Sequence, residues 1–149
     1  MPYVHVENTI SSDINSVWNI VSKIEDYPQV MPSVNSVQVE KEEGHVSVSH
    51  WNVSLRESIM CWTEKDIQDP KNYRIDFEQT DGDLAEFKGH WQLKTDPSDT
   101  NKTIASLAIE FDIGIPALED ILNPIAIDAL HENSNSMLNS IAAYWEGVA

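Results

Sequence analysis

Hydrophobic and polar residues alternate at the start of the chain, and the period then becomes helical. Val4 and Val6 alternate with polar neighbours, which predicts a strand over residues 3–10. Asp13 and the two serines before it supply side-chain oxygens that cap a helix, and the apolar residues that follow recur at helical spacing. These residues are Ile14, Val17, Trp18, Val21 and Ile24. The pattern predicts an amphipathic helix near residues 13–24.

Two prolines limit the next element. Pro28 and Pro32 each disfavour helical backbone at the residue before them, so we expect a short or broken helix near 26–32. From residue 34 to residue 113 the period is two, and clusters of turn-forming residues interrupt it. These clusters lie at 42–44, 69–72, 81–83 and 95–99. The segment therefore predicts an antiparallel meander of about six strands.

One stretch of this meander breaks the alternation. Val46 and Val48 belong to one face of a regular strand, whereas Trp51 and Val53 belong to the other. An extra residue in the strand would bring all four onto one face. The pattern predicts a β-bulge near residues 49–50.

The C-terminal part of the chain returns to a helical period. Pro116 suits the first turn of a helix, and the main helix is expected near residues 120–146, with Pro124 kinking it or separating a short entry turn. An antiparallel sheet with one apolar face needs a cover, and this helix is the only large element available. We therefore expect an α+β fold, in which a curved antiparallel sheet of about seven strands wraps around the long C-terminal helix in a single domain spanning 1–149.

Several short motifs, in a fixed order, carry a resemblance to a known family. They are Val17-Trp18, Glu25-Asp26-Tyr27-Pro28, Trp62-Thr63-Glu64, Phe77-Glu78-Gln79 followed by Gly82-Asp83-Leu84, Phe87-Lys88-Gly89-His90-Trp91, and Asn133-Ser134-Asn135-Ser136-Met137. With these motifs, nearly the whole chain resembles the START-like (SRPBCC) superfamily, and within it the polyketide cyclase/dehydrase branch that also includes coenzyme Q-binding proteins. The resemblance implies a helix-grip fold with two short helices after the first strand. It does not specify a function, because the superfamily includes cyclases, hydroxylase domains, lipid carriers and hormone binders.

The last helix also resembles that of the aromatase/cyclase subgroup, in which an asparagine-rich or threonine-rich stretch precedes a methionine. Here that stretch is 133–137. Other subgroup features are absent: Asp66 stands at the cationic position, Val34 at the phenolic position, and Gln79 or Glu78 at a second arginine position. The resemblance therefore implies a similar cavity with different polar groups, and the subgroup's mechanism does not transfer as it stands.

The resemblance and the inward parity of the strands together nominate the residues that would contact a substrate in the cavity. Trp62 and Trp91 are expected as cavity wall rather than close-packed core. Asn133 and Asn135 lie about 200° apart on a helix, so at most one of them faces the sheet. The nominated substrate-binding residues are Tyr27, Met31, Trp51, Trp62, Phe77, Gln79, Phe87, Trp91, Asn133 and Met137.

Three charged residues are candidates for catalysis. Arg56 either points its donors into the cavity, where they would stabilise an enolate or phenolate oxygen, or lies at a hairpin end paired with Glu57 or another surface acid. Glu64 and Asp66 share parity with Trp62, so an inward Trp62 brings both carboxyl groups to the cavity, where burial would raise their pKa towards that of a useful general base. The alternative for Asp66 is a solvated rim.

Composition excludes several classes of function. The 25 Asp and Glu against 9 Lys and Arg give a formal net charge of −16, which disfavours nucleic acid and anionic lipid as partners. The single cysteine, Cys61, forms no internal disulfide, and no apolar run approaches the roughly 18 residues of a membrane span. The five histidines show no metal-ligand spacing. We expect a cytoplasmic protein, monomeric or homodimeric, without membrane insertion, metal or cofactor.

Two functions follow from these expectations. In the first, the protein is a polyketide cyclase, aromatase or dehydratase, which folds an apolar polyketide-like substrate in the cavity and promotes aldol-type ring closure with loss of water. In the second, it is a non-catalytic carrier or chaperone of a small hydrophobic molecule such as a quinone, a fatty acyl chain or a finished polyketide. The substrate is expected to be met free, unless Lys23, Arg56, Lys65 and Arg74 form a basic rim at the pocket mouth for an acidic carrier protein.

Overall fold

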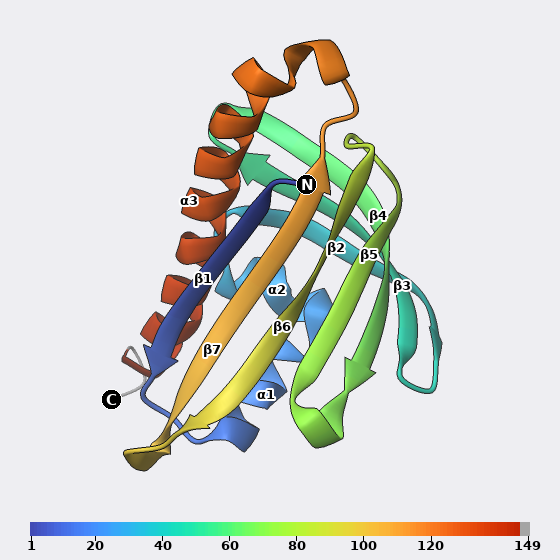
Figure 1. Cartoon of the computed structure of the whole chain (residues 1–149). Coiled ribbons are helices and arrows are strands. Elements are labelled where there is room, and N and C mark those ends of the chain that lie inside the picture. The colour runs from blue at the N-terminus through green and yellow to red at the C-terminus, as the bar shows by residue number, and fades with distance from the viewer. Residues whose placement is uncertain (147–149) are drawn as a thin grey trace.

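Seven antiparallel strands form one strongly curved sheet in the computed structural model, which describes residues 1–146 (Figure 1). The order across the sheet is β1-β7-β6-β5-β4-β3-β2, so every neighbouring pair except β1 and β7 is consecutive along the chain. The strands are β1 (Tyr3–Ile10), β2 (Val34–Glu43), β3 (Val46–Leu55), β4 (Ser58–Asp69), β5 (Arg74–Gly82), β6 (Glu86–Asp96) and β7 (Asp99–Asp112). The predicted antiparallel sheet is confirmed.

The helices lie where the change of period predicts them, with different bounds. They are α1 (Ile14–Val21), α2 (Tyr27–Val30), α3 (Glu119–Glu146) and the short 3₁₀ helices η1 (Ile24–Asp26), η2 (Pro70–Asn72) and η3 (Pro116–Leu118). Asp13 caps α1, because its carboxylate accepts from the Ser16 backbone N–H at 3.2 Å. Pro124 does not divide α3: it lies near the helix start, where a missing N–H costs few hydrogen bonds, and η3 supplies the separate entry turn.

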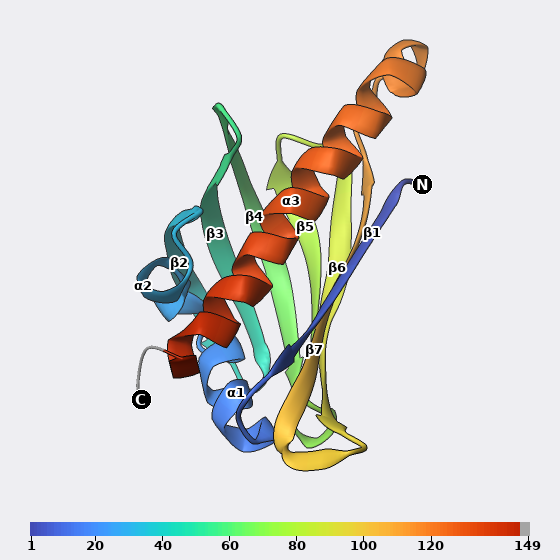
Figure 2. The ribbon, with the colours of Figure 1, turned by 90° about the vertical axis from the view of Figure 1, so that its left-hand side faces the viewer.

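Helix α3 runs diagonally across the concave face of the sheet, and its N-terminal end extends beyond the strands (Figure 2). Leu130, Leu138 and Ile141 are buried against the sheet, whereas Ile121 and Ile125 near the helix start are 63% and 55% exposed. The core therefore forms along the central and C-terminal parts of α3, as the helix-grip arrangement requires.

The bulge predicted near residues 49–50 is wrong. Strand β3 pairs with β4 without any shift of register, and its alternate residues Ser47, Ser49, Trp51 and Val53 are buried. The extra residue lies instead in β2, opposite this part of β3, where the register shifts between residues 39 and 41. The hydrophobic pattern misleads here because the inward positions at the start of β3 hold Ser47 and Ser49, so the alternating Val46 and Val48 face outward.

Two glycines allow large aromatic side chains to lie flat on the curved sheet. A Cβ atom at Gly89 would lie 1.9 Å from the carbonyl oxygen of Ala108 and 2.8 Å from the ring of Phe77. A Cβ atom at Gly82 would lie 2.5 Å from the Cβ of Trp62, its partner across β4 and β5. Both contacts are shorter than real carbon neighbours allow, so any larger side chain displaces either the sheet or the aromatic ring.

We expect Gly89→Ala to lower the free energy of unfolding by about 3 kcal/mol, because the new methyl group overlaps a backbone oxygen that cannot move without breaking the β6–β7 pairing. The matched control is Gly44→Ala. Gly44 has a positive φ of 62° and open space around it, so the added methyl costs only backbone strain, about 1 kcal/mol. Urea denaturation of both variants measures the difference, and equal losses would show that Gly89 is not crowded.

Candidate active site

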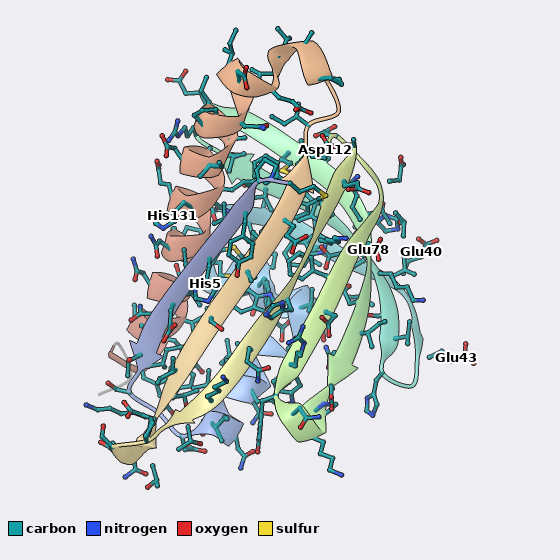
Figure 3. All side chains as sticks on the ribbon, viewed as in Figure 1. His5, Glu40, Glu43, Glu78, Asp112 and His131 are labelled. Carbon is teal, nitrogen blue, oxygen red and sulfur yellow. The ribbon has the colours of Figure 1, made fainter. Side chains whose placement is uncertain are left out.

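A small apolar cavity lies between α3 and the concave face of the sheet. Its walls come from β3 to β7 and from the middle of α3, and its volume is about 50 Å³. That volume suits a few water molecules, whereas sites for drug-sized ligands have about 300–1,000 Å³. Side chains fill most of the space under α3 (Figure 3). A larger hollow of about 340 Å³ lies on the opposite, convex face, but it is open and lined by charged residues such as Lys65, Glu78 and Lys88.

Tryptophan and phenylalanine rings make the sheet wall of the cavity. Trp51 and Trp62 are direct partners across β3 and β4, and their rings stack with centroids 5.4 Å apart and an interplanar angle of 7°. Phe87 meets Trp62 edge-on at 5.1 Å. The nominated residues that line the cavity are Trp51, Trp62, Phe77, Phe87, Trp91, Asn133, Met137 and Glu64. The cavity therefore offers a flat aromatic surface with one carboxyl group at its side.

Two carboxyl groups lie buried at this wall. Glu64 and Asp66 are alternate residues of β4 and are 3% and 0% exposed, so the solvated rim considered for Asp66 is wrong. The Trp62 indole N–H donates to Glu64 Oε1 at 2.6 Å, and the Ser49 hydroxyl donates to Asp66 Oδ2 at 2.5 Å. The Trp51 indole N–H donates to that serine oxygen at 2.8 Å. A chain of donors on two paired strands thus holds both carboxyl groups in place.

Burial determines the charge of this pair. It raises the pKa of Glu64 well above its usual value, and the neighbouring Asp66 carboxylate raises it further against the opposing Trp62 hydrogen bond. Burial also raises the pKa of Asp66, but hydrogen bonds from Glu64 and Ser49 to its carboxylate oppose that rise. These shifts favour the protonated form, more strongly for Glu64 than for Asp66, and the two carboxyl groups titrate as a coupled pair. Among the described side chains, no lysine, arginine or histidine lines the cavity.

Helix α3 contributes polar atoms to the opposite wall. Ser134 is 1% exposed, and neither its hydroxyl oxygen nor Asn133 Oδ1 has a hydrogen-bond partner in the described structure. Asn133 Nδ2 lies 3.6 Å from the sulfur of Met137. Asn135 lies on the other side of the helix, where its side chain contacts Nδ1 of His131 at 3.2 Å, and His131 faces away from the sheet (Figure 3). Only one of the two asparagines thus reaches the cavity.

Arg56 does not line the cavity, so its proposed inward orientation is wrong. It lies in the turn between β3 and β4 with a positive φ of 56°, and its side chain is 44% exposed. Its guanidinium group contacts Glu132 of α3 at 3.4 Å, which is the alternative of a hairpin-end arginine paired with a surface acid. The turn therefore places its side chain at the exposed edge between the β3–β4 turn and α3.

Three other nominated residues also lie away from the cavity. Tyr27 is buried beneath Trp51, and its hydroxyl donates to the Val21 carbonyl oxygen at 2.6 Å. Burial, and after it the negative charge of the nearby Asp66–Glu64 pair, raise the pKa of this phenol, so it stays protonated. Met31 is fully buried in the core, and the Gln79 amide donates to the Leu84 carbonyl oxygen at 2.7 Å, within its own hairpin. These residues support the fold rather than face a ligand.

The basic rim considered for a carrier protein does not form. Lys65 lines the hollow on the convex face, and Arg74 pairs with Asp76 at 3.0 Å. Neither accompanies Arg56 at the edge of the cavity. The described part of the chain also holds no group of three or more His, Cys, Asp or Glu residues arranged to bind a metal ion, and none of its helices is long and apolar enough to cross a membrane.

Sequence reasoning missed two serines of the site. Ser49 was missed because Val46 and Val48 appeared to break the alternation of the strand. Counting back from the inward-facing Trp51 in steps of two residues would have placed Ser49 on the same buried face. Ser134 lies four residues after Leu130 and three before Met137, so all three share the buried face of α3. This spacing could have identified Ser134 as a buried residue from the sequence.

Comparisons with known proteins agree with this architecture. A Thermus thermophilus protein superposes with a TM-score of 0.88 at 22% identity, covering 99% of each chain. The Zhui aromatase/cyclase of a Streptomyces strain superposes with a TM-score of 0.86 at 19% identity, covering 97% of this chain and 93% of its own. A START superfamily protein from Mycobacterium smegmatis superposes with a TM-score of 0.84 at 14% identity over the whole of both chains. At these identities the likeness shows the fold alone.

The sequence itself identifies the family. No curated protein matches the chain significantly. Residues 10–138 match the family described as polyketide cyclase / dehydrase and lipid transport. This match takes in six of the seven strands, α1, α2 and most of α3. The chain therefore belongs to the polyketide cyclase/dehydrase and lipid transport family.

Proposed function

We propose that this protein binds an apolar, polyketide-like molecule in the cavity and promotes its cyclisation with loss of water, with Glu64 as the general acid–base group. The observation that carries the proposal is the buried pair of Glu64 and Asp66, of which Glu64 lines the cavity. A carboxyl group that keeps its proton near neutral pH can both donate and accept protons there. A simple binding pocket needs no such group.

The single proton on the pair suffices for an aldol-type ring closure. Glu64 passes its proton to Asp66 and takes the acidic proton between two carbonyl groups of the substrate, and the resulting enolate carbon forms a bond to a second carbonyl carbon. Glu64 then returns a proton to the oxygen of that carbonyl, which becomes a hydroxyl group. In the dehydration that follows, Glu64, now ionised while Asp66 holds the shared proton, removes a second α-proton and then gives it to the departing hydroxyl, which leaves as water. After each half, one proton is again shared by the pair.

Glu64 and Asp66 have different roles because they have different surroundings. Glu64 meets the substrate, and Asp66, which lies behind it, keeps the proton on Glu64 through its own carboxylate. The flat wall of Trp51 and Trp62 would hold a conjugated chain in a folded form and exclude water from the reacting carbons. This chemistry requires no cofactor.

The second candidate is a carrier of a hydrophobic molecule. It is favoured by the apolar character of most of the cavity lining and by the lipid transport in the family's description. The two candidates differ in whether Glu64 is needed for more than binding.

We expect Glu64→Gln to lower the rate of ring closure of a linear triketone about 100-fold or more, with little change in the affinity for that triketone. Glutamine reproduces the shape and hydrogen bonds of the protonated acid but exchanges no proton. Ultraviolet absorbance of the cyclised product measures the rate, and equilibrium dialysis measures the affinity. Glu78→Gln, an exposed residue of β5 that points away from α3, is the control (Figure 3). Full activity of Glu64→Gln would refute the catalytic role, and a wild-type protein that binds without turnover would favour the carrier.

The raised pKa of Glu64 also predicts a pH dependence of stability. Above about pH 4.3, the usual pKa of glutamate, the unfolded chain releases the Glu64 proton and the folded protein keeps it. The free energy of unfolding of the wild type therefore falls as pH rises, until the raised folded pKa is reached. Glu64→Gln lacks this loss, so we expect its stability relative to the wild type to increase as the pH rises above about 4.3, the usual pKa of glutamate. Urea denaturation measures the difference, and a difference that is constant with pH would contradict the raised pKa.

A further inference from the structure

Two unpartnered polar atoms on α3 face the cavity from the side opposite Glu64. They are the Ser134 hydroxyl oxygen, on a side chain that is 1% exposed, and Asn133 Oδ1. More than nine in ten buried polar groups in proteins have a hydrogen-bond partner, and leaving one without a partner costs about 1–3 kcal/mol. A water molecule could supply these hydrogen bonds, and so could a polar group of a ligand that displaces the water from the cavity.

The chemistry of these atoms restricts the ligand. Asn133 Oδ1 only accepts hydrogen bonds, and the serine hydroxyl both accepts and donates. A hydroxyl group on the ligand satisfies the two together, since it donates to the amide oxygen and accepts from the serine. A carbonyl or ether oxygen would satisfy only the serine.

The charges at the cavity restrict the ligand further. Glu64 and Asp66 are buried at the sheet wall, and no cationic side chain is among the described residues that line the cavity. The cation of this region, Arg56, is engaged with Glu132 at the surface. A ligand carboxylate would lose its hydration without gaining a counter-ion, next to two acidic groups.

We propose that the cavity selects an uncharged aromatic molecule that carries a hydroxyl group, with its ring against Trp62 and its hydroxyl on Asn133 and Ser134, and that it rejects a carboxylate of the same shape. This inference rests on the proposed function, because it concerns the same cavity, and it narrows the occupant to phenol-like molecules. Fatty acids and aromatic acids are excluded as occupants.

The cavity must widen for such a ring, and the helix wall allows it. Met137 has three rotatable bonds and fills irregular gaps. It is buried in the cavity wall, and the polar contact of its sulfur is a weak one, from the Asn133 amide at 3.6 Å. A change of rotamer at Met137 would open space beside Trp62, which lines the same cavity as Asn133 and Ser134.

Three probes of one shape test the inference: naphthalene, 2-naphthol and 2-naphthoate. Their affinities for the wild-type protein are measured at neutral pH by equilibrium dialysis. We expect 2-naphthol to bind about tenfold more tightly than naphthalene, which corresponds to the hydrogen bonds on α3, and 2-naphthoate to bind more weakly than naphthalene. In the double variant Asn133→Ala/Ser134→Ala, the preference for naphthol over naphthalene should disappear.

The matched control is Asn135→Ala/Ser136→Ala, which changes the same residue types on the outer side of α3 and should keep the preference. Circular dichroism verifies that both variants fold, and the comparison of the three probes on the wild type does not depend on any variant. Naphthoate binding as tightly as naphthol, or a preference that survives in the cavity-facing variant, would overturn the inference and leave the proposed function intact. Failure of all three probes to bind would overturn both.

Discussion

The removal of two carboxyl groups from water constrains the sheet wall of this protein. Moving an ionised carboxylate into a protein interior costs several kcal/mol even after relaxation, and the cost must be offset by hydrogen bonds or by a proton. Here Trp62 and Ser49 donate hydrogen bonds to the two groups, and burial raises the pKa of Glu64, which favours its protonated form. These donors reach the carboxyl groups because β3 and β4 pair in an unbroken register. The serines at the start of β3 and the stacked tryptophans further along it belong to one arrangement, which holds a proton beside an apolar cavity.

The large aromatic residues of this wall also require close approaches within the curved sheet. Rings as large as Trp62 and Phe77 fit against the strands only because Gly82 and Gly89 leave space for them. Curvature then brings β3 and β4 over towards α3, so the cavity is enclosed on two sides. At about 50 Å³ it is nearly closed without a ligand. The link between Arg56 and Glu132 joins the β3–β4 turn to α3, but it is a single exposed contact at 3.4 Å and contributes little to keeping the cavity shut. Opening therefore depends mainly on the packing of the helix wall around Met137.

The fold was largely predictable from the sequence, because the change from helical to alternating period marks each element and two faces of different polarity mark the sheet. The aromatic wall and Glu64 were predictable for the same reason, since they share parity with Trp62. Prediction failed where side-chain polarity and burial disagree. Ser49 was missed and a bulge was misplaced because buried serines resemble exposed ones in a hydrophobic pattern. Arg56 was misplaced because the orientation of a residue in a tight turn depends on backbone angles that the pattern does not contain.

Carbon NMR measures the protonation state of Glu64 directly. In protein labelled with ¹³C at the glutamate side-chain carboxyl carbon, the Glu64 signal is assigned by its loss in Glu64→Gln and followed as the pH is raised. We expect this signal to keep the chemical shift of a protonated carboxyl group to a pH well above about 4.3, the usual pKa of glutamate. A Glu64 signal that changes to the shift of an ionised carboxylate near that usual pKa would contradict a buried, protonated Glu64.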